Sequence, residues 1–337
     1  MTVLVTGGAG FIGAHVAKHL LDANREVVVL DDLSGGYLAN VPEGATFVEG
    51  SVTDPELVED LFREHRFTHV FHLAAYAAEG LSHFIRRFNY TNNVVGSINV
   101  INSALRAETV ERLVFTSSIA VYGPGQTPMT EALTPEPEDP YGIAKYAVEL
   151  DLAAAQRMFG LDYTIFRPHN VYGELQNIAD TYRNVIGIFM NQLLSDRPMT
   201  IFGDGLQTRA FTHIDDVAPV IARSIDVPAS ANETFNVGAD TPYTVLELAQ
   251  TVARVLGVEE PQIEHLPPRL EVVHAFSDHS KLHDVFGEQN AVTLEDGLRR
   301  MAEWVQEVGA RPPVRFDSVE ILRNLPPSWA AGMAQSV

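Results

Sequence analysis

The opening stretch constrains the fold of this chain more than any other. Its residues Val3–Thr6 are apolar or β-branched, as in a buried strand, and three glycines follow at a spacing of three, Gly7, Gly10 and Gly13. A helical apolar pattern through Val16 comes next. This order of strand, glycine turn and helix directs backbone N–H groups and a helix N-terminus toward a pyrophosphate. Glycine is needed because a Cβ atom would obstruct the turn or the phosphates.

A carboxylate follows the second strand of this unit. The apolar run Val27–Leu30 leads directly to Asp31, about twenty residues after the glycine turn. A carboxylate at this position accepts hydrogen bonds from the adenosine ribose hydroxyls and repels a 2′-phosphate. We therefore predict that the chain binds NAD rather than NADP.

The composition argues against several classes of partner and site. The chain has 337 residues, and its 44 acidic against 23 basic residues give a net charge of −21, which repels nucleic acid and anionic membranes. There is no cysteine, and the histidines lack a metal-ligand spacing, so we predict neither disulfides nor a metal site. The chain starts with a strand instead of a secretory signal, and no apolar run could cross a bilayer. We expect a cytoplasmic protein.

Strand-like runs alternate with helical patterns through the first half of the chain, which is typical of a parallel sheet covered by helices on both faces. The fold class that we predict is α/β, a Rossmann-type doubly wound parallel sheet with a smaller α+β region toward the C-terminus. Further strands are expected at 46–48, 70–73, 113–116, 163–166 and 234–237, and helices at about 55–65, 88–107 and 141–159.

The alternation of strand-like and helical patterns ends after Arg167, where glycine, asparagine and proline become frequent. We therefore expect an NAD-binding Rossmann domain at 1–170, with a returning segment at about 211–240, and a second region built from 171–210 and 241–325. The tail beyond Arg311 contains two Pro-Pro pairs and is expected to be an irregular wrap or a loose end.

The residues that suggest chemistry stand at the start of a helix and the end of a strand. Tyr141 and Lys145 are four residues apart and lie on one helical face, where the ammonium favours the phenolate and lowers the pKa of the phenol. Ser117 and Ser118 end the fifth strand, at the sheet edge where ligands bind. A base, an orienting hydroxyl, a lysine and a dinucleotide together indicate hydride transfer at a secondary alcohol.

Several motifs in order resemble the extended short-chain dehydrogenases/reductases, close to the UDP-glucose 4-epimerase group. The resemblance covers about residues 1 to 300. The matching motifs are Thr6–Gly13, Leu73–Ala75, Asn92–Asn93, Ser117–Ser118 with Val121–Gly123, Tyr141 with Lys145, Arg167–Asn170, Ile201–Gly205 with Arg209, and Asp215–Asp216.

The resemblance implies an epimerase that keeps NAD bound throughout turnover. Tyr141 would take the proton from the 4-hydroxyl of a UDP-sugar while C4 gives a hydride to NAD. The 4-keto sugar would then turn and accept the hydride on its other face. Ser118 would touch the substrate oxygen, and Lys145 would hold the nicotinamide ribose. The helices at 88–107 and 141–159 would pair across a two-fold axis in a homodimer.

The same resemblance implies two sets of binding residues. For NAD they are Gly7, Gly10, Phe11, Ile12, Gly13, Asp31, Asp32, Ser34, Ser51, Val52, Leu73, Ala74, Ala75, Asn92, Ser117, Tyr141, Lys145 and Pro168. For the sugar nucleotide they are Ser118, Tyr141, Asn170, Asn184, Val185, Thr200, Phe202, Arg209, Arg269, Glu271 and Ala275.

Alternatives remain open on the identity of the sugar. The small Ala275 leaves room for a 2-acetamido group, which predicts activity on UDP-GlcNAc and UDP-GalNAc besides UDP-glucose and UDP-galactose. Arg86 and Arg87, in a basic loop at 79–87, suggest a UDP-glucuronate 4-epimerase, although they also fit a solvated helix start. Dehydration is disfavoured because Ser118–Ala120 contains no acid that could protonate a leaving hydroxyl. A non-catalytic NAD-binding sensor is the remote alternative.

Overall fold

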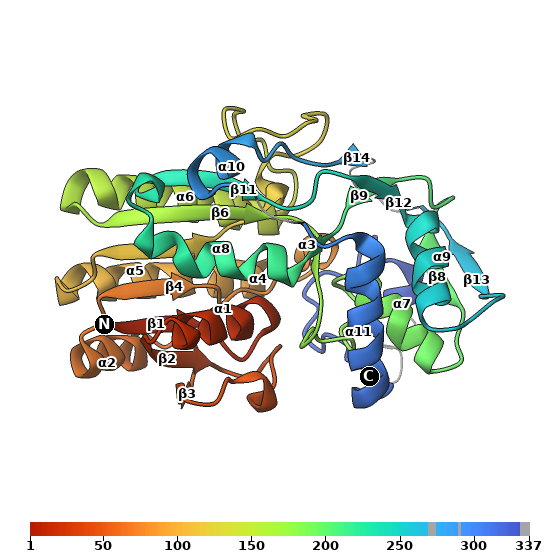
Figure 1. Ribbon diagram of the computed structural model, residues 1–337, viewed down its shortest axis with the longest axis horizontal. Coiled ribbons are helices and arrows are strands. Elements are labelled where there is room, and N and C mark those ends of the chain that lie inside the picture. The colour runs from red at the N-terminus through yellow and green to blue at the C-terminus, as the bar shows by residue number, and fades with distance from the viewer. Residues whose placement is uncertain (269–273, 289–290, 331–337) are drawn as a thin grey trace.

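A computed structural model describes residues 1–268, 274–288 and 291–330 of the chain (Figure 1). Its centre is a seven-stranded sheet in the order β11-β6-β5-β4-β1-β2-β3, and all neighbouring strands are parallel. The α/β fold class with a doubly wound sheet is therefore confirmed. The strands are β1 (Thr2–Thr6), β2 (Glu26–Asp31), β3 (Thr46–Glu49), β4 (His69–His72), β5 (Arg112–Thr116), β6 (Asp162–Pro168) and β11 (Glu233–Val237).

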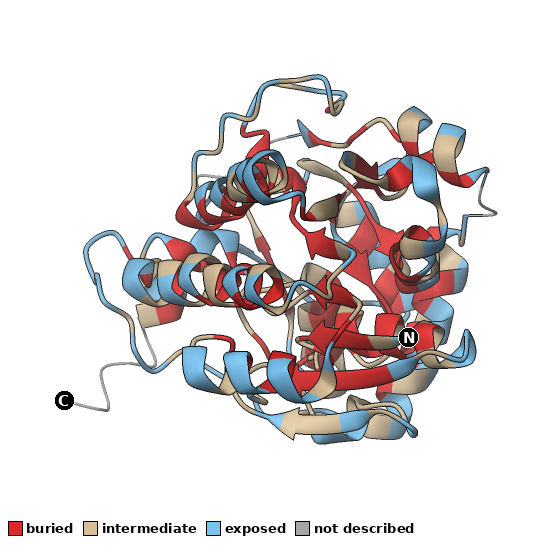
Figure 2. Ribbon diagram, turned by 90° about the vertical axis from the view of Figure 1, so that its left-hand side faces the viewer, coloured by how far each residue is buried: buried red, intermediate tan, exposed pale blue. Residues whose placement is uncertain are grey.

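Helices cover both faces of this sheet, so the central strands are buried on both sides (Figure 2). This is why the sequences of these strands are continuous apolar runs instead of alternating apolar and polar residues. Two apolar clusters form the layers between helices and sheet. One face carries α1 (Phe11–Asp22), α8 (Ala218–Arg223) and α10 (Ser280–Phe286), and the other carries α2 (Pro55–His65), α5 (Gly96–Ala107) and α6 (Pro140–Phe159).

Two segments of the predicted fold are corrected by the structure. The expected loop at 79–87 contains a short helix, α3 (Glu79–Ser82), and the start of another, α4 (Arg86–Tyr90). The expected regular helix at 88–107 is interrupted by a π-helical turn, Thr91–Val95, before α5 begins. Within this turn Asn93 accepts a hydrogen bond from the backbone N–H of Tyr76 and donates to its carbonyl.

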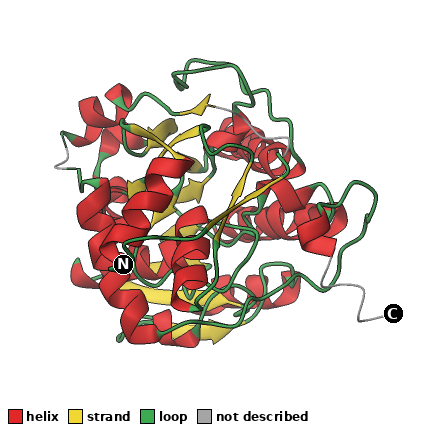
Figure 3. Ribbon diagram, turned by 90° about the vertical axis from the view of Figure 1, so that its right-hand side faces the viewer, coloured by secondary structure: helices red, strands yellow, loops and turns green. Residues whose placement is uncertain are grey.

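A second, smaller region lies beyond the carboxyl ends of the strands (Figures 1 and 3). An apolar cluster fills it. Its helices are α7 (Val185–Leu194), α9 (Val245–Val255) and α11 (Leu294–Val308), and its strands are β7 (Val171–Tyr172), β8 (Met199–Phe202), β9 (Thr208–Ala210), β10 (Thr212–His213), β12 (Pro242–Thr244), β13 (Ile263–Leu266) and β14 (His274–Ala275).

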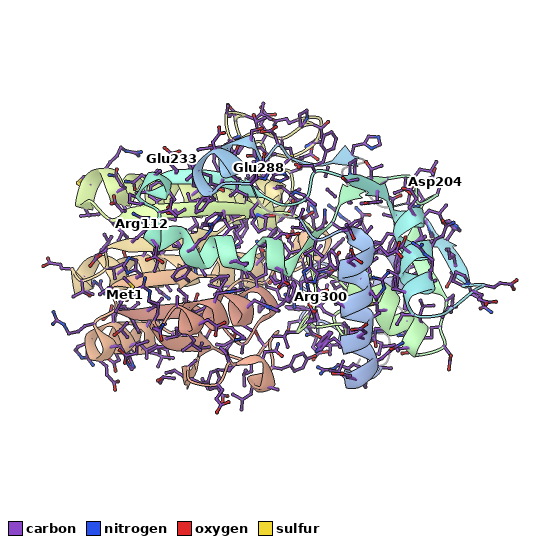
Figure 4. All side chains as sticks on the ribbon, viewed as in Figure 1. Met1, Arg112, Asp204, Glu233, Glu288 and Arg300 are labelled. Carbon is purple, nitrogen blue, oxygen red and sulfur yellow. The ribbon has the colours of Figure 1, made fainter. Side chains whose placement is uncertain are left out.

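Polar contacts join α11 to the sheet region. Arg300, labelled in Figure 4 on α11, lies 2.8 Å from Asp215 and 3.2 Å from Glu174. Asp215 lies in the turn Ile214–Asp216 that leads into α8, so this ion-pair cluster fixes the helix against a sheet-covering element. Among the described residues, no helix has the length and apolar character required to span a membrane.

After α11 the described part of the tail packs back onto the segment that follows β4, as expected for an irregular wrap, and residues 331–337 lie outside the described residues. We call residues 316–330 the C-terminal strap. It ends in a short helix, α12 (Pro327–Ala330), and its side chains Leu325 and Trp329 are buried. They pack in a separate apolar cluster with Leu81 and Ile85, so the strap is part of the folded body.

Candidate active site

A cavity of about 730 Å³ opens where the carboxyl ends of the strands meet the second region. Such a position, outside the strand ends of a parallel sheet, is where α/β folds bind ligands. Apart from Ser51, every predicted catalytic, cofactor-binding and substrate-binding residue within the described ranges lines this cavity. Arg269 and Glu271 lie outside the described residues.

The glycine turn forms one end of the cavity. A Cβ atom on Gly13 would lie 2.1 Å from the carbonyl oxygen of Gly7, and one on Gly7 would lie 2.7 Å from the backbone nitrogen of Ala74. The backbone can take this shape only without side chains. Gly10 is the N-cap of α1 and no side chain caps this helix, so its first N–H groups are available to an anion. This cradle fits the pyrophosphate of NAD.

Asp31 stands at the end of β2, beside the same turn. Its carboxylate accepts hydrogen bonds from the backbone N–H groups of Ala9, at 3.0 Å, and Leu33, at 2.8 Å. Burial raises the pKa of this carboxyl group, while the two backbone bonds oppose the rise. Hydroxyl donors from a ribose would stabilise the ionised form further, so the position fits the adenosine end of a dinucleotide.

Ser51 is the exception among the predicted cofactor residues. Its hydroxyl shares a hydrogen bond with that of Thr53, at 3.0 Å. Its neighbours Gly50 and Val52 line the cavity, but Ser51 itself does not. At this point the cavity wall is therefore formed by the residues on either side of Ser51.

Tyr141 and Lys145 reach the cavity from the first turns of α6. Pro140 is the first residue of this helix, and the Asp139 side chain caps it by accepting from the N–H groups of Tyr141 and Gly142. The Lys145 ammonium lies 5.8 Å from the centre of the Tyr141 ring and donates to the carbonyl oxygen of Thr116 at 2.7 Å. The predicted pair is thus brought together at the end of β5.

The predicted acidification of Tyr141 is wrong for the pocket formed by the protein alone. Burial raises the pKa of Tyr141 above that of free tyrosine, the charge of Glu79 adds to the rise, and a hydrogen bond with Ser118 opposes it. Burial also lowers the pKa of Lys145 to about 7, against the attraction of Glu149. Desolvation by the surrounding side chains, which helical spacing does not reveal, is the largest cause of the rise in the pKa of Tyr141.

A buried ion pair supports the floor of the site. Glu149 lies one turn after Lys145 on α6, and Arg167 stands near the end of β6. Two guanidinium nitrogens of Arg167 contact the two Glu149 oxygens at 3.0 and 2.5 Å, and a third donates to the Tyr122 hydroxyl at 2.7 Å. The Ser117 hydroxyl donates to the same carboxylate. The ends of β5 and β6 are thereby fixed relative to α6.

The predicted substrate residues line the opposite end of the cavity. Asn170 and Asn184 both have positive φ, +41° and +59°, a conformation that asparagine tolerates better than most residues. Their side-chain amides donate to the carbonyl oxygens of Ala210, at 3.0 Å, and Val171, at 2.7 Å. Ala275 is buried beside Tyr122 and Met129. These backbone bonds fix both asparagines in the wall.

The two arginines considered for an acidic sugar are not part of this wall. Arg86 and Arg87 are exposed at the start of α4 and do not line the cavity. The backbone N–H of Arg87 donates to the Glu320 carboxylate at 2.8 Å, so the residue belongs to a helix start capped by the C-terminal strap. The interpretation as a solvated helix start is the one that the structure supports.

Other cavity residues had no signal in the sequence motifs. Tyr76, Glu79, Tyr182 and Arg183 also line the cavity. They come from the segment after β4 and from the long connection before α7, which meet only in the folded chain. In the sequence, the signal for these cavity residues is limited to the aromatic and charged side chains that the two connections contain.

Comparisons with known proteins agree with this geometry. A model of the NAD dependent epimerase/dehydratase family matches residues 3–238. The UDP-glucose 4-epimerase of Mycolicibacterium smegmatis is 34% identical over 313 residues, 90% of this chain and 98% of its own. Two solved UDP-glucose 4-epimerases have the same fold over 91% of this chain and 99% of theirs: that of Thermotoga maritima with UDP-glucose (34% identity, TM-score 0.87) and that of Thermus thermophilus with NAD (32%, 0.84). The chain belongs to the NAD-dependent epimerase/dehydratase family.

Proposed function

We propose that this enzyme interconverts UDP-sugars that differ in configuration at C4. The observation that carries the proposal is the set Ser118, Tyr141 and Lys145, gathered in one cavity with a glycine cradle that fits NAD. The similarity to UDP-glucose 4-epimerases over nearly their whole length supports the same reaction. We assign NAD to residues 1–170 and the segment at about 211–240, and the sugar nucleotide to 171–210 and 241–325.

Each member of this set has a defined task. Tyr141 takes the proton from the 4-hydroxyl of the sugar and returns it to the same oxygen after the configuration has changed. Ser118 lines the same cavity as Tyr141 and orients the substrate oxygen toward the phenol. Lys145 is fixed by Thr116 and contributes positive charge beside the phenolate. When bound, NAD supplies the hydride acceptor and a positively charged ring that lowers the pKa of a nearby phenol.

Conversion of a substrate panel tests this proposal. Purified enzyme is incubated with UDP-glucose, UDP-galactose, UDP-GlcNAc, UDP-GalNAc and UDP-glucuronate, and the anomeric proton signals are followed by NMR. We expect each active substrate to give its 4-epimer, and Tyr141→Phe to abolish the conversion. A panel without any 4-epimer would favour the non-catalytic sensor, and loss of the 6-hydroxyl would indicate a dehydratase.

The proposed sugars are UDP-glucose and UDP-galactose together with their 2-acetamido forms. Ala275 lines the cavity and its methyl group occupies little of the wall, which leaves room for an acetamido substituent. UDP-glucuronate is the second candidate. It is less favoured because Arg86 and Arg87 do not line the cavity, although Arg209 and Arg183 do.

We further propose a cytoplasmic homodimer. The segment from the π-helical turn to the end of α6 exposes the apolar side chains Val95, Ile143 and Leu150, which a second copy could cover. Size-exclusion chromatography with light scattering measures the mass directly. We expect twice the chain mass of 37.0 kDa, and a monomer at working concentration would contradict the proposal.

A further inference from the structure

Arg183 lies in the cavity wall without any assigned role. Its side chain is held on two sides: Nε donates to Asp180 at 2.7 Å, and the guanidinium carbon lies 4.8 Å from the centre of the Tyr76 ring. The Asp180 carboxylate also accepts from the backbone N–H of Tyr182. The planar group is therefore fixed in orientation, while its two Nη atoms are not used by the ion pair with Asp180.

These terminal nitrogens lie against the loop that packs on the glycine turn. A Cβ atom on Gly35 would lie 3.2 Å from Nη2 and 3.9 Å from Nη1 of Arg183. The next residue, Gly36, is so close to the turn that its Cβ would lie 2.4 Å from the Ala9 oxygen and 2.8 Å from the Gly10 nitrogen. The guanidinium thus lies beside the uncapped N-terminus of α1, in the same cavity.

The connection that carries Arg183 is docked onto this loop by further polar contacts. The Asn177 amide donates to the carbonyl oxygen of Gly35 at 3.2 Å, and its own oxygen accepts from the Tyr37 hydroxyl at 2.8 Å. The Asn40 amide donates to the carbonyl oxygens of Ala9 and Leu175. Residues 175–183 therefore close the cavity over the glycine turn.

The C-terminal strap packs on both segments that hold Arg183. Phe316 packs on Tyr76, with ring centres 5.5 Å apart, and Trp329 packs on Tyr182 at 5.2 Å. Just before the strap, the Val314 N–H donates to the carbonyl oxygen of Ala179 at 2.8 Å. The strap thereby ties the segment after β4 to the connection before α7, the two elements between which the guanidinium is clamped.

We propose that Arg183 binds the pyrophosphate of NAD opposite the N-terminus of α1, and that the C-terminal strap holds it in place for this. Helix N–H groups and a guanidinium fork complement a pyrophosphate from two sides, and Arg is suited to two parallel charge-assisted bonds with phosphate oxygens. The assignment depends on the NAD dependence of the family and not on which sugar the enzyme converts.

Binding measurements on four variants test the assignment. NAD-free protein is titrated with NADH, whose fluorescence reports binding, and NAD-loaded protein is titrated with UDP by calorimetry. Arg183→Gln should weaken NADH binding about 10- to 100-fold and leave UDP binding within about twofold. Arg183→Lys should lose less, and Phe316→Ala should weaken NADH binding in the same direction. Arg86→Gln, an exposed arginine outside the cavity, is the matched control and should bind NADH as the parent does.

Two outcomes would overturn the assignment. One is an unchanged NADH affinity in Arg183→Gln, verified as folded by circular dichroism. The other is a loss of UDP affinity alone, which would place Arg183 on the diphosphate of the sugar nucleotide. If Arg183→Gln loses NADH affinity while Phe316→Ala keeps that of the parent, the part of the proposal that concerns the strap is wrong. Because binding is read without turnover, these results are independent of the proposed epimerase reaction.

Discussion

The buried pair of Glu149 and Arg167 gives the sharpest prediction about stability. Each residue is 5% exposed, and together they make three contacts of 3.0 Å or less, with Tyr122 as the third partner. Arg167→Met leaves the Glu149 carboxylate buried, with Ser117 as its remaining hydrogen-bond donor in the described part of the chain. Stranding one charge of a buried pair costs about 3–5 kcal/mol. This is a large part of the about 5–15 kcal/mol by which folded proteins are stable.

The double variant Glu149→Gln with Arg167→Met separates this cause from a general loss of packing. It removes both charges, keeps an oxygen that accepts from Ser117, and leaves Tyr122 its bond to Asn236 at 2.9 Å. We expect it to lie within about 2 kcal/mol of the parent, so that the two single effects are non-additive by at least about 2 kcal/mol. Urea unfolding followed by circular dichroism measures all four proteins. Single effects that add within about 0.5 kcal/mol would refute the reasoning.

Three further predictions concern the cavity. Gly13→Ala should abolish NAD binding because its Cβ would lie 2.1 Å from the Gly7 oxygen, whereas Gly187→Ala, whose Cβ meets its nearest neighbour at 3.5 Å, should bind NADH normally in the same fluorescence titration. Ala275→Tyr should lower kcat/KM for UDP-GlcNAc at least about tenfold more than for UDP-glucose, and equal losses would reject the role of Ala275. The pKa of Lys145 falls to about 7 on folding, so the unfolded chain binds the extra proton between pH 7 and 10.5. The NAD-free parent should therefore gain stability relative to Lys145→Met as pH rises through this window, by at most about 1.4 kcal/mol per pH unit, measured by urea unfolding.

The sheet and the catalytic motifs could be predicted because their signals are local in sequence. Strands β1, β2 and β5 are buried on both faces and show as apolar runs, and α2 begins at Pro55, close to the start expected from its sequence pattern. Glycines at a tight turn and a tyrosine four residues before a lysine are likewise local patterns. Such patterns identify a helix or strand and also indicate which of its ends faces the ligand.

Features that depend on distant contacts could not be predicted in this way. The π-helical turn in the helix after β4 is accompanied by bonds between Asn93 and the backbone of Tyr76, seventeen residues earlier. The partners of Arg183 come from three separate segments, and the clamp around it is completed by the C-terminal strap. The pKa of Tyr141 follows from burial by the assembled walls, which no spacing encodes.

The fate of the hydrogen at C4 tests the central claim most directly. The enzyme is incubated with UDP-galactose that carries deuterium at C4, in ordinary water, and the UDP-glucose formed is analysed by NMR and mass spectrometry. Hydride transfer to bound NAD and back, with Tyr141 moving only the hydroxyl proton, predicts that the product keeps the deuterium at C4. Replacement of that deuterium by solvent hydrogen during epimerisation would contradict the account.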